Sequence, residues 1–242
     1  MSAYCTCIWD VQQVSSAIVW AYSIKKTNTT FPLIIMIAED LPVNIDQTLL
    51  KVFDHVYRVP VINSKIKTKI KTDPRTFTRW QVFQLKEWTD VVLMDCNMIV
   101  VRNLDMLFNY ETPACICSLY NSITDPVMDG QKIPAVDIRI CVEKNGIRTY
   151  AMKVKPDSRS LNNIITNNKN IKINKFISPD EYISTKIRVS WTHISMKYFR
   201  PVWQTGDSHA LLYIKSGQNQ PTEQDNKMWF DYLDQAKADL QI

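Results

Sequence analysis

Short apolar runs alternate with amphipathic stretches through the first half of the chain. The length and continuous apolar character of the runs are typical of buried strands. They lie at residues 3–9, 32–40, 55–61 and 91–95. The stretches between them carry apolar residues at helical spacing, over 11–28, near 47–53 and over 76–90. This order of strand and helix predicts an α/β fold in which helices flank a mainly parallel central sheet.

The helix expected over 76–90 leads directly into the last of these strands. Thr76 or Thr78 is suited to cap its N-terminus, and its apolar stripe would pack on the sheet. The strand that follows is apolar on both faces, as a central parallel strand should be, and Asp95 lies at its carboxyl end. Ligands of open α/β sheets gather outside the carboxyl ends of the strands. Asp95 is therefore placed where a ligand would bind.

The second half of the chain has a less regular pattern. Strands are expected over 114–120, 136–143, 148–155 and 209–215, and helices over 156–165 and 225–240. The last helix carries Trp229, Phe230 and Tyr232, for which packing in the protein's own core is favoured over an oligomer surface. No internal repeat or low-complexity linker divides the sequence. Residues 1–242 are therefore expected to form a single domain.

The cysteines and the charge narrow the possible chemistry only slightly. The six cysteines lack the paired spacing of a zinc site, so buried reduced thiols are favoured over a disulfide or a metal site. The net charge of +5 is concentrated in the basic segment 64–75, which reads as a solvated loop, an edge strand or a phosphate site. Nucleic-acid binding is disfavoured because no aromatic residues alternate with the lysines. Glycine is scarce, at 4 residues, so few turns can approach a phosphate closely.

The N-terminal sequence lacks the basic segment and apolar core of a signal peptide, and no apolar run is long enough to span a membrane. The expected location is the cytoplasm, or the host cytoplasm or virion if the source is a virus.

The tripeptide Asp95-Cys96-Asn97 interrupts an otherwise apolar region. One interpretation is a tight turn at the end of a strand, because Asp and Asn bond to their own backbone. The other is a metal and phosphate site, because carboxylate and amide oxygens are ligands for hard cations.

The sequences TFTRWQVFQL at 76–85 and VVLMDCNMIVVRNLDMLF at 91–108 resemble the glycogenin-like family of retaining glycosyltransferases. The small viral members of the family are the most similar in length and in lacking a targeting segment. The opening strand, helix and second strand are similar too, and the resemblance covers residues 3 to about 118 before it weakens. It implies a single Rossmann-like domain of the GT-A type. Residues 1–118 would form the nucleotide-binding half and residues 119–242 the acceptor-side half.

The resemblance also implies a metal site with altered ligands. The family holds manganese between two acids of an Asp-x-Asp motif and a later histidine, and here Asp95 matches the first acid while Asn97 replaces the second. Leu212 stands at the histidine position, and His209 could serve instead if the register shifts. Manganese binding is therefore expected to be weak or lost, because a neutral amide and a leucine replace a carboxylate and an imidazole.

Three further residues match positions where the family contacts its donor substrate. Arg79 matches a lysine that contacts the donor, although a helix-surface residue paired with an acid is the alternative. Lys71, with Lys69 nearby, lies where relatives carry another basic donor contact. Asp10 matches a polar position that meets the base or ribose. No catalytic residue is assigned.

The activity implied is transfer of a hexose from a UDP-sugar, with retention of configuration, to an unknown protein or glycan acceptor. The alternative is a catalytically impaired relative that acts as a binding or structural module, because the acid, the histidine and the glycine turns of the family are replaced together. Either protein could form a homo-oligomer.

Overall fold

The computed structural model describes residues 1–63, 73–118, 127–140, 146–157, 159–160, 179–186, 188–202, 207–212 and 221–242. Strands and helices alternate through the first half of the chain, as the sequence predicts. In order they are β1 (Ser2–Ile8), the 3₁₀ helix η1 (Val11–Gln13), α1 (Val14–Lys26), β2 (Leu33–Ala38), α2 (Asn44–Leu49), β3 (His55–Val59), the 3₁₀ helix η2 (Pro74–Gln84), β4 (Asp90–Met94) and β5 (Met98–Val100).

The second half adds shorter elements around the same sheet. They are the 3₁₀ helix η3 (Asp105–Asn109), β6 (Ala114–Ser118), β7 (Lys132–Ile133), α3 (Ala135–Ile140), β8 (Gly146–Val154), α5 (Pro179–Ser184), β9 (Trp191–His193), the 3₁₀ helix η7 (Met196–Tyr198), β10 (Phe199–Pro201), β11 (Ala210–Leu212) and α6 (Glu223–Leu240).

The described strands form one large sheet and one small sheet. The large sheet has eight strands in the order β3-β2-β1-β4-β8-β6-β9-β7. Strands β1 to β4 run parallel, whereas β8 runs antiparallel to β4 and β6, and β7 runs antiparallel to β9. The predicted α/β fold with a mainly parallel central sheet is thus confirmed. The small sheet has the order β10-β11-β5.

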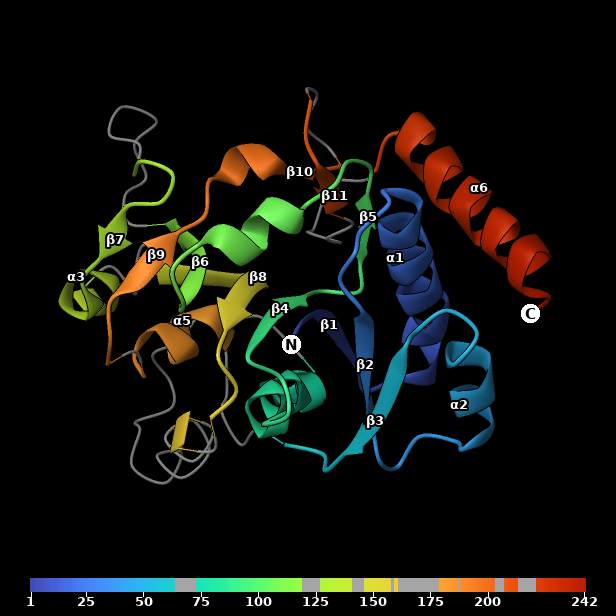
Figure 1. Ribbon diagram of the computed structural model, residues 1–242, viewed down its shortest axis with the longest axis horizontal. Helices are drawn as coiled ribbons and strands as arrows, with labels where there is room; N and C mark the ends of the chain where they lie inside the picture. The colour runs from blue at the N-terminus through green and yellow to red at the C-terminus, as the bar shows by residue number, and fades with distance from the viewer. Residues whose placement is uncertain are drawn as a thin grey trace.

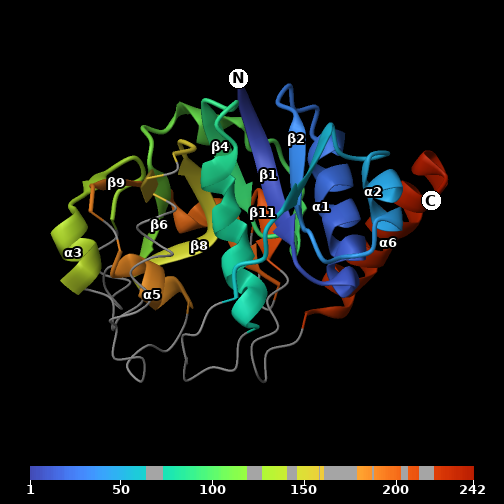
Figure 2. The same ribbon diagram turned by 90° about the horizontal axis from the view of Figure 1, so that it is seen from below.

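Helices cover the faces of the central parallel strands, which explains why β1, β2 and β4 are largely apolar, whereas the edge strand β3 is only partly buried. Every residue of β2 is buried, as is every residue of β1 after Ser2. Helices α1 and α2 lie beside β1 to β3, and α6 packs against the outer side of α1 (Figures 1 and 2). A strand apolar on both faces can lie in this position because burial of apolar surface is the dominant favourable contribution to folding.

The strand expected over 136–143 is wrong for its described part, because α3 is a helix. Pro134 lies just before it, and its carbonyl accepts hydrogen bonds from the N–H groups of Asp137 and Ile138. Ile138 is buried while Val136 is 49% exposed, so the alternation of apolar residues does not produce a two-sided strand. Residues 141–143 lie outside the described part of the chain, as do 158 and 161–165 of the helix expected over 156–165.

Several other boundaries differ from the prediction: α2 lies a few residues earlier than expected, and η2 ends at Gln84 and not at residue 90. The start of η2 differs too. Its cap is Asp73, whose carboxylate accepts a hydrogen bond from the Arg75 N–H at 2.8 Å, and not Thr76 or Thr78. Thr78 is fully buried and accepts a hydrogen bond from the Ile62 N–H at 3.2 Å. Proline after the cap favours this arrangement, because Pro74 fixes a helical φ and needs no hydrogen-bond partner there.

The described cysteines are buried free thiols, as the sequence predicts; they are Cys5, Cys7, Cys96, Cys115 and Cys117. Cys141 lies outside the described residues. Among the described helices, none combines the length and the apolar character that crossing a membrane requires.

Candidate functional site

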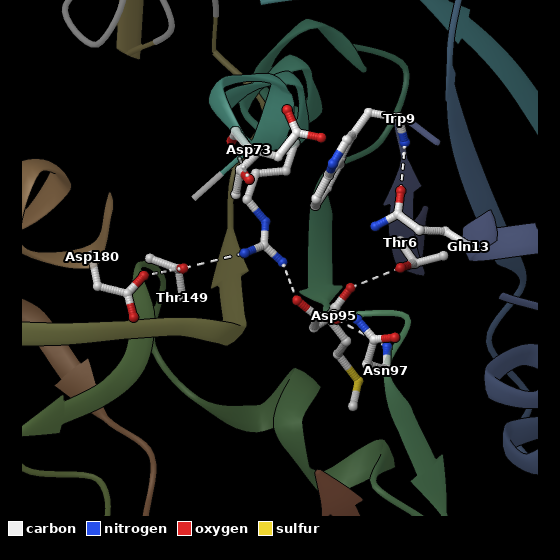
Figure 3. Close-up of polar contacts among 11 residues, drawn as sticks. Thr6, Trp9, Gln13, Asp73, Asp95, Asn97, Thr149 and Asp180 are labelled. Carbon is white, nitrogen blue, oxygen red and sulfur yellow. Dashed lines mark hydrogen bonds and ion pairs between the residues drawn. The ribbon is translucent and has the colours of Figure 1, made fainter. Parts of the chain in front are cut away.

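Asp95 lies immediately after β4, at the carboxyl edge of the parallel strands. The hydroxyl of Thr6 on β1 donates to the Met94 carbonyl at 2.9 Å (Figure 3). The Asp95 N–H donates to the Tyr150 carbonyl of β8 at 2.9 Å. The backbone on either side of the carboxylate is therefore fixed by both neighbouring strands. This is the edge of the sheet at which the sequence placed a ligand site.

The carboxylate of Asp95 pairs with the guanidinium of Arg79, a residue of η2. Arg79 Nη2 lies 3.2 Å from Asp95 Oδ2, and Nη1 donates to the Thr149 hydroxyl at 3.3 Å (Figure 3). Arg79 does pair with an acid, as the alternative expected, but at 7% exposed it is buried and does not lie on the helix surface. Its buried Nε has no hydrogen-bond partner among the described residues.

The hydrogen-bond network continues from Thr149 to a second carboxylate. The Thr149 hydroxyl donates to Asp180, in the first turn of α5. Burial raises the pKa of Asp180, against the opposing effects of the Thr149 hydrogen bond and the positive charges of Arg79 and Arg148. One arginine is thus held between two acids, one paired with it directly and the other connected through Thr149.

Asn97 folds back on Asp95. Its backbone N–H and its side-chain amide each donate to Asp95 Oδ1 at 2.9 Å. This is the tight turn that the first interpretation of Asp95-Cys96-Asn97 expected. The turn also lies in the wall of a pocket, so the two interpretations are not exclusive.

The pocket beside Asp95 encloses about 800 Å³, a size typical of small-molecule sites. One end is polar, with Arg79, Asp95, Thr149 and Asp180. The other end combines amides and aromatic rings. It is lined by Gln12, Gln13, Ser16, Asn226, Trp229 and Phe230.

The aromatic residues of α6 follow the predicted core packing only in part, because Trp229 and Tyr232 pack against the core and Phe230 does not. Phe230 is 57% exposed, and it lines the pocket together with Trp229, whose ring it meets edge-on at 5.1 Å between centroids. Tyr232 does pack inward, edge-on against Tyr22 of α1 at 6.4 Å. The prediction is thus wrong for Phe230, because the helix turns only part of its aromatic surface towards α1.

The register of β11 decides whether Leu212 or His209 faces the pocket. Leu212 pairs with Met98 of β5 and lines the pocket, in the position where the resemblance places a ligand histidine. The His209 carbonyl accepts hydrogen bonds from Val101 and Arg102 at the far end of β5, at 2.8 and 3.2 Å. Val101 is four residues along the chain from Asn97, a separation of about 13 Å at about 3.3 Å per residue.

The structure therefore does not bring His209 to Asp95 and Asn97. The His209 ring lies edge-on to Tyr198 at 5.2 Å, and burial together with Arg102 and Lys197 lowers its pKa.

The arrangement around Asp95 does not fit a resident divalent cation. Both carboxylate oxygens already accept hydrogen bonds from Arg79 or Asn97, and Leu212 offers no ligand atom. The described residues hold no cluster of three or more His, Cys, Asp and Glu side chains suited to a metal ion. A nearby guanidinium also opposes a cation by charge repulsion.

The other predicted contacts have different outcomes. Asp10 caps η1, accepting a hydrogen bond from the Gln12 N–H at 2.8 Å, while Gln13 Oε1 accepts from the Asp10 N–H at 3.1 Å. Asp10 thus shapes the segment whose next residues, Gln12 and Gln13, line the pocket. Lys71 and Lys69 lie outside the described residues.

The sequence prediction missed Thr149, Asp180 and the amides of Gln12 and Asn226. No short motif marks them, because they come from four separate elements. Phe230 had a visible signal, since a large apolar residue next to charged Asp231 on an amphipathic helix often marks the edge of its buried face.

Comparison with known proteins gives a consistent result. No protein-family model matches the chain. An uncharacterized protein of Acanthamoeba polyphaga mimivirus, R707, is 27% identical over 209 residues, covering 81% of this chain and 70% of that protein. Glycogenin-1 of Caenorhabditis elegans is 27% identical over 111 residues, which is 44% of this chain and 26% of that protein.

The solved structures extend the similarity to the whole chain. The galactosyltransferase LgtC, solved in complex with donor and acceptor sugar analogs, superposes with a TM-score of 0.65 at 8% identity over 97% of this chain and 96% of its own. The glycosyltransferase GlyE of Streptococcus pneumoniae gives 0.59 at 11% identity over 96% of this chain and 61% of its own.

The chain has the GT-A fold, and its sequence is similar to that of glycogenin over part of its length. An Arabidopsis thaliana UDP-glucuronate:xylan alpha-glucuronosyltransferase is also 27% identical, over 45% of this chain and 18% of its own length. The chain therefore spans about a quarter or less of the two curated glycosyltransferases it matches in sequence. Their similarity covers less than half of this chain, whereas the fold similarity covers nearly all of it.

Proposed function

We propose that the protein is a retaining glycosyltransferase that transfers a hexose from a UDP-sugar, and that the pocket beside Asp95 receives the donor. The observation that carries the proposal is the buried Arg79 guanidinium held against Asp95 at the carboxyl edge of a GT-A sheet. A protein or glycan would be the acceptor.

Arg79 is suited to bind the diphosphate. A guanidinium has five N–H donors, and its hydrogen bonds to Asp95 and Thr149 engage one on each terminal nitrogen. A second N–H remains on each terminal nitrogen of Arg79, which lines the pocket, so these two groups can donate to a phosphate. Burial strengthens a charge-assisted hydrogen bond to phosphate, because the local dielectric constant is lower than in water.

The other end of the pocket suits the nucleoside. Aromatic rings stack on nucleobases, and the rings of Trp229 and Phe230 lie in the wall of the pocket. The amides of Gln12 and Asn226 can both donate and accept hydrogen bonds, as recognition of a uracil edge requires. A donor that spans the pocket would place its base near α6 and its diphosphate near Arg79.

The chemistry requires stabilisation of a departing diphosphate. Negative charge develops on the leaving group as the glycosidic bond breaks, and a preorganised cation lowers the energy of that state. Arg79 is held in place by Asp95 and Thr149, so little reorganisation is needed. Positioning of donor and acceptor in one pocket supplies the rest of the rate acceleration.

A specific observation favours a second candidate, a catalytically impaired binding module. Leu212 and Asn97 replace two of the three side-chain ligands that the family resemblance implies, so nucleotide binding could persist without transfer. Such a binding module would bind UDP but would not cleave any UDP-hexose.

Calorimetric titration with UDP, followed by measurement of UDP release from several UDP-hexoses, tests both candidates. An active enzyme should bind UDP and should also release UDP from at least one UDP-hexose. NMR of the glycosylated product should then show the same anomeric configuration as in the donor sugar. Binding without release favours the module. Absence of UDP binding contradicts the proposed function outright.

A further inference from the structure

A second pocket lies at the opposite edge of the sheet. It encloses about 720 Å³, and we call it the distal pocket. Val154, in its wall, pairs with Val91 at the beginning of β4, whereas Asp95 follows the end of that strand. Pro113, just before β6, and Trp191, the first residue of β9, also line it. The distal pocket is therefore at the amino ends of β4, β6 and β9, at the edge of the sheet opposite Asp95.

The walls of the distal pocket are apolar. The buried side chains of Trp80, Phe83 and Trp191 line it together with Ile183. Val189 at the same pocket is 57% exposed. Apolar walls of this kind favour a ligand with an apolar body, because its transfer from water removes apolar surface from solvent.

The rim is strongly basic. Lys155, Arg159, Lys186 and Arg188 line the distal pocket. Lys155, Arg159 and Lys186 make no ion pair within 4.0 Å among the described residues. Burial and the nearby charge of Arg188 lower the pKa of Lys186, which is the effect expected where cations are crowded.

The one acidic lining residue is already engaged locally. The Asp157 carboxylate accepts hydrogen bonds from the Arg159 N–H at 3.0 Å and from the Ser160 N–H and hydroxyl at 3.3 and 3.1 Å. These backbone hydrogen bonds lower its pKa. The lining thus places one acid beside several cations, three of which (Lys155, Arg159 and Lys186) have no ion pair among the described residues, and an anion would complete the charge balance.

We propose that the distal pocket binds an amphipathic anion, a molecule with an apolar body and a phosphate head group. The apolar body would occupy the space between the aromatic walls and the head group would lie among the rim cations. The apolar walls and the rim cations of the distal pocket are different residues from those that line the pocket beside Asp95, so the proposal does not depend on the proposed function. The two pockets do share elements, since η2 supplies Arg79 to one and Trp80 to the other.

Dodecyl phosphate, used below its critical micelle concentration, is the probe that tests the distal pocket. Binding is followed by calorimetry and by the change in intrinsic tryptophan fluorescence, to which Trp80 and Trp191 in the wall of the distal pocket should contribute. Dodecanol and inorganic phosphate separate the contributions of the two parts of the probe. We expect each to bind at least tenfold more weakly than dodecyl phosphate, and saturating UDP not to displace the probe.

Variants locate the site. Lys155→Glu combined with Arg159→Glu should weaken probe binding at least tenfold, and Val189→Glu at least fivefold. All three positions are exposed, so the variants should fold. The control is Lys227→Glu, which changes an exposed lysine of α6 outside both pockets and should leave the affinity unchanged. Equal binding by the wild type and the rim variants, competition by UDP, or binding of inorganic phosphate as tight as that of the probe would each overturn the proposal.

Discussion

Removal of the Arg79 side-chain charge should affect both stability and nucleotide binding. In Arg79→Met the apolar stem is largely kept, but Asp95, whose side chain is 24% exposed, loses its ion-pair partner. Loss of one partner of a fully buried pair costs about 3–5 kcal/mol, and the partial exposure of Asp95 reduces the expected cost to about 2–3 kcal/mol. For a chain of this size that is a fall in melting temperature of roughly 4–12 °C.

A double-mutant cycle isolates the contribution of the pair. Urea unfolding of the wild type, Arg79→Met, Asp95→Asn and the double variant gives the coupling free energy. We expect the double variant to be more stable than the sum of the single changes by about 1–2 kcal/mol, because neither charge is then left alone. Additive effects would show that the 3.2 Å contact contributes nothing to stability and would refute the account of the site.

The same variant tests the role in binding. Loss of a charged hydrogen bond to phosphate costs about 1.5–3 kcal/mol, which weakens UDP affinity by roughly 10–100-fold. The matched control is Arg58→Met, which breaks the ion pair of Arg58 and Asp46 at 2.7 Å outside the pocket. It should lower stability without changing UDP affinity. If Arg79→Met binds UDP as tightly as the wild type does, Arg79 is not a phosphate ligand.

Three further predictions follow from other parts of the structure. In the wild type, manganese should change the affinity for UDP less than about threefold. In the variant that combines Leu212→His with Asn97→Asp, manganese should change that affinity at least about tenfold, because the two substitutions supply the missing ligands. Calorimetric titration with manganese or with EDTA measures both effects. Gly146→Ala should cost about 2–4 kcal/mol in urea unfolding, because φ is +54° and the new Cβ would clash with α5, whereas Gly130→Ala, at φ +79° in open space, should cost only about 1 kcal/mol. Burial alone would raise the pKa of Asp129, but hydrogen bonds from two tyrosine hydroxyls and a backbone N–H outweigh burial and lower that pKa. The loss of stability in Asp129→Asn should therefore be complete above about pH 4 and should become smaller as the pH falls further. A loss of stability that does not depend on pH would contradict this prediction.

Local pattern was a reliable guide where local physics dominates. The strands β1, β2 and β4 are largely apolar because both faces are covered, so their positions could be read from the chain directly. The position of Asp95 followed from the same pattern, since a side chain directly after a central strand must lie at the carboxyl edge. In the strand predicted over 136–143, the local alternation was misleading because Pro134 starts a helix there.

The sequence by itself determined the fold class, the buried thiols and the edge of the sheet at which Asp95 lies. Only the tertiary structure decided what surrounds Asp95: Arg79 and Asp180 come from elements far apart in the chain, and Phe230 reaches the pocket from the last helix. Antiparallel register also decided that Leu212, and not His209, faces the pocket. The physical reason is that strand and helix periodicity are encoded in neighbouring residues, whereas a site depends on contacts between distant segments, which only the packing of the whole chain can fix.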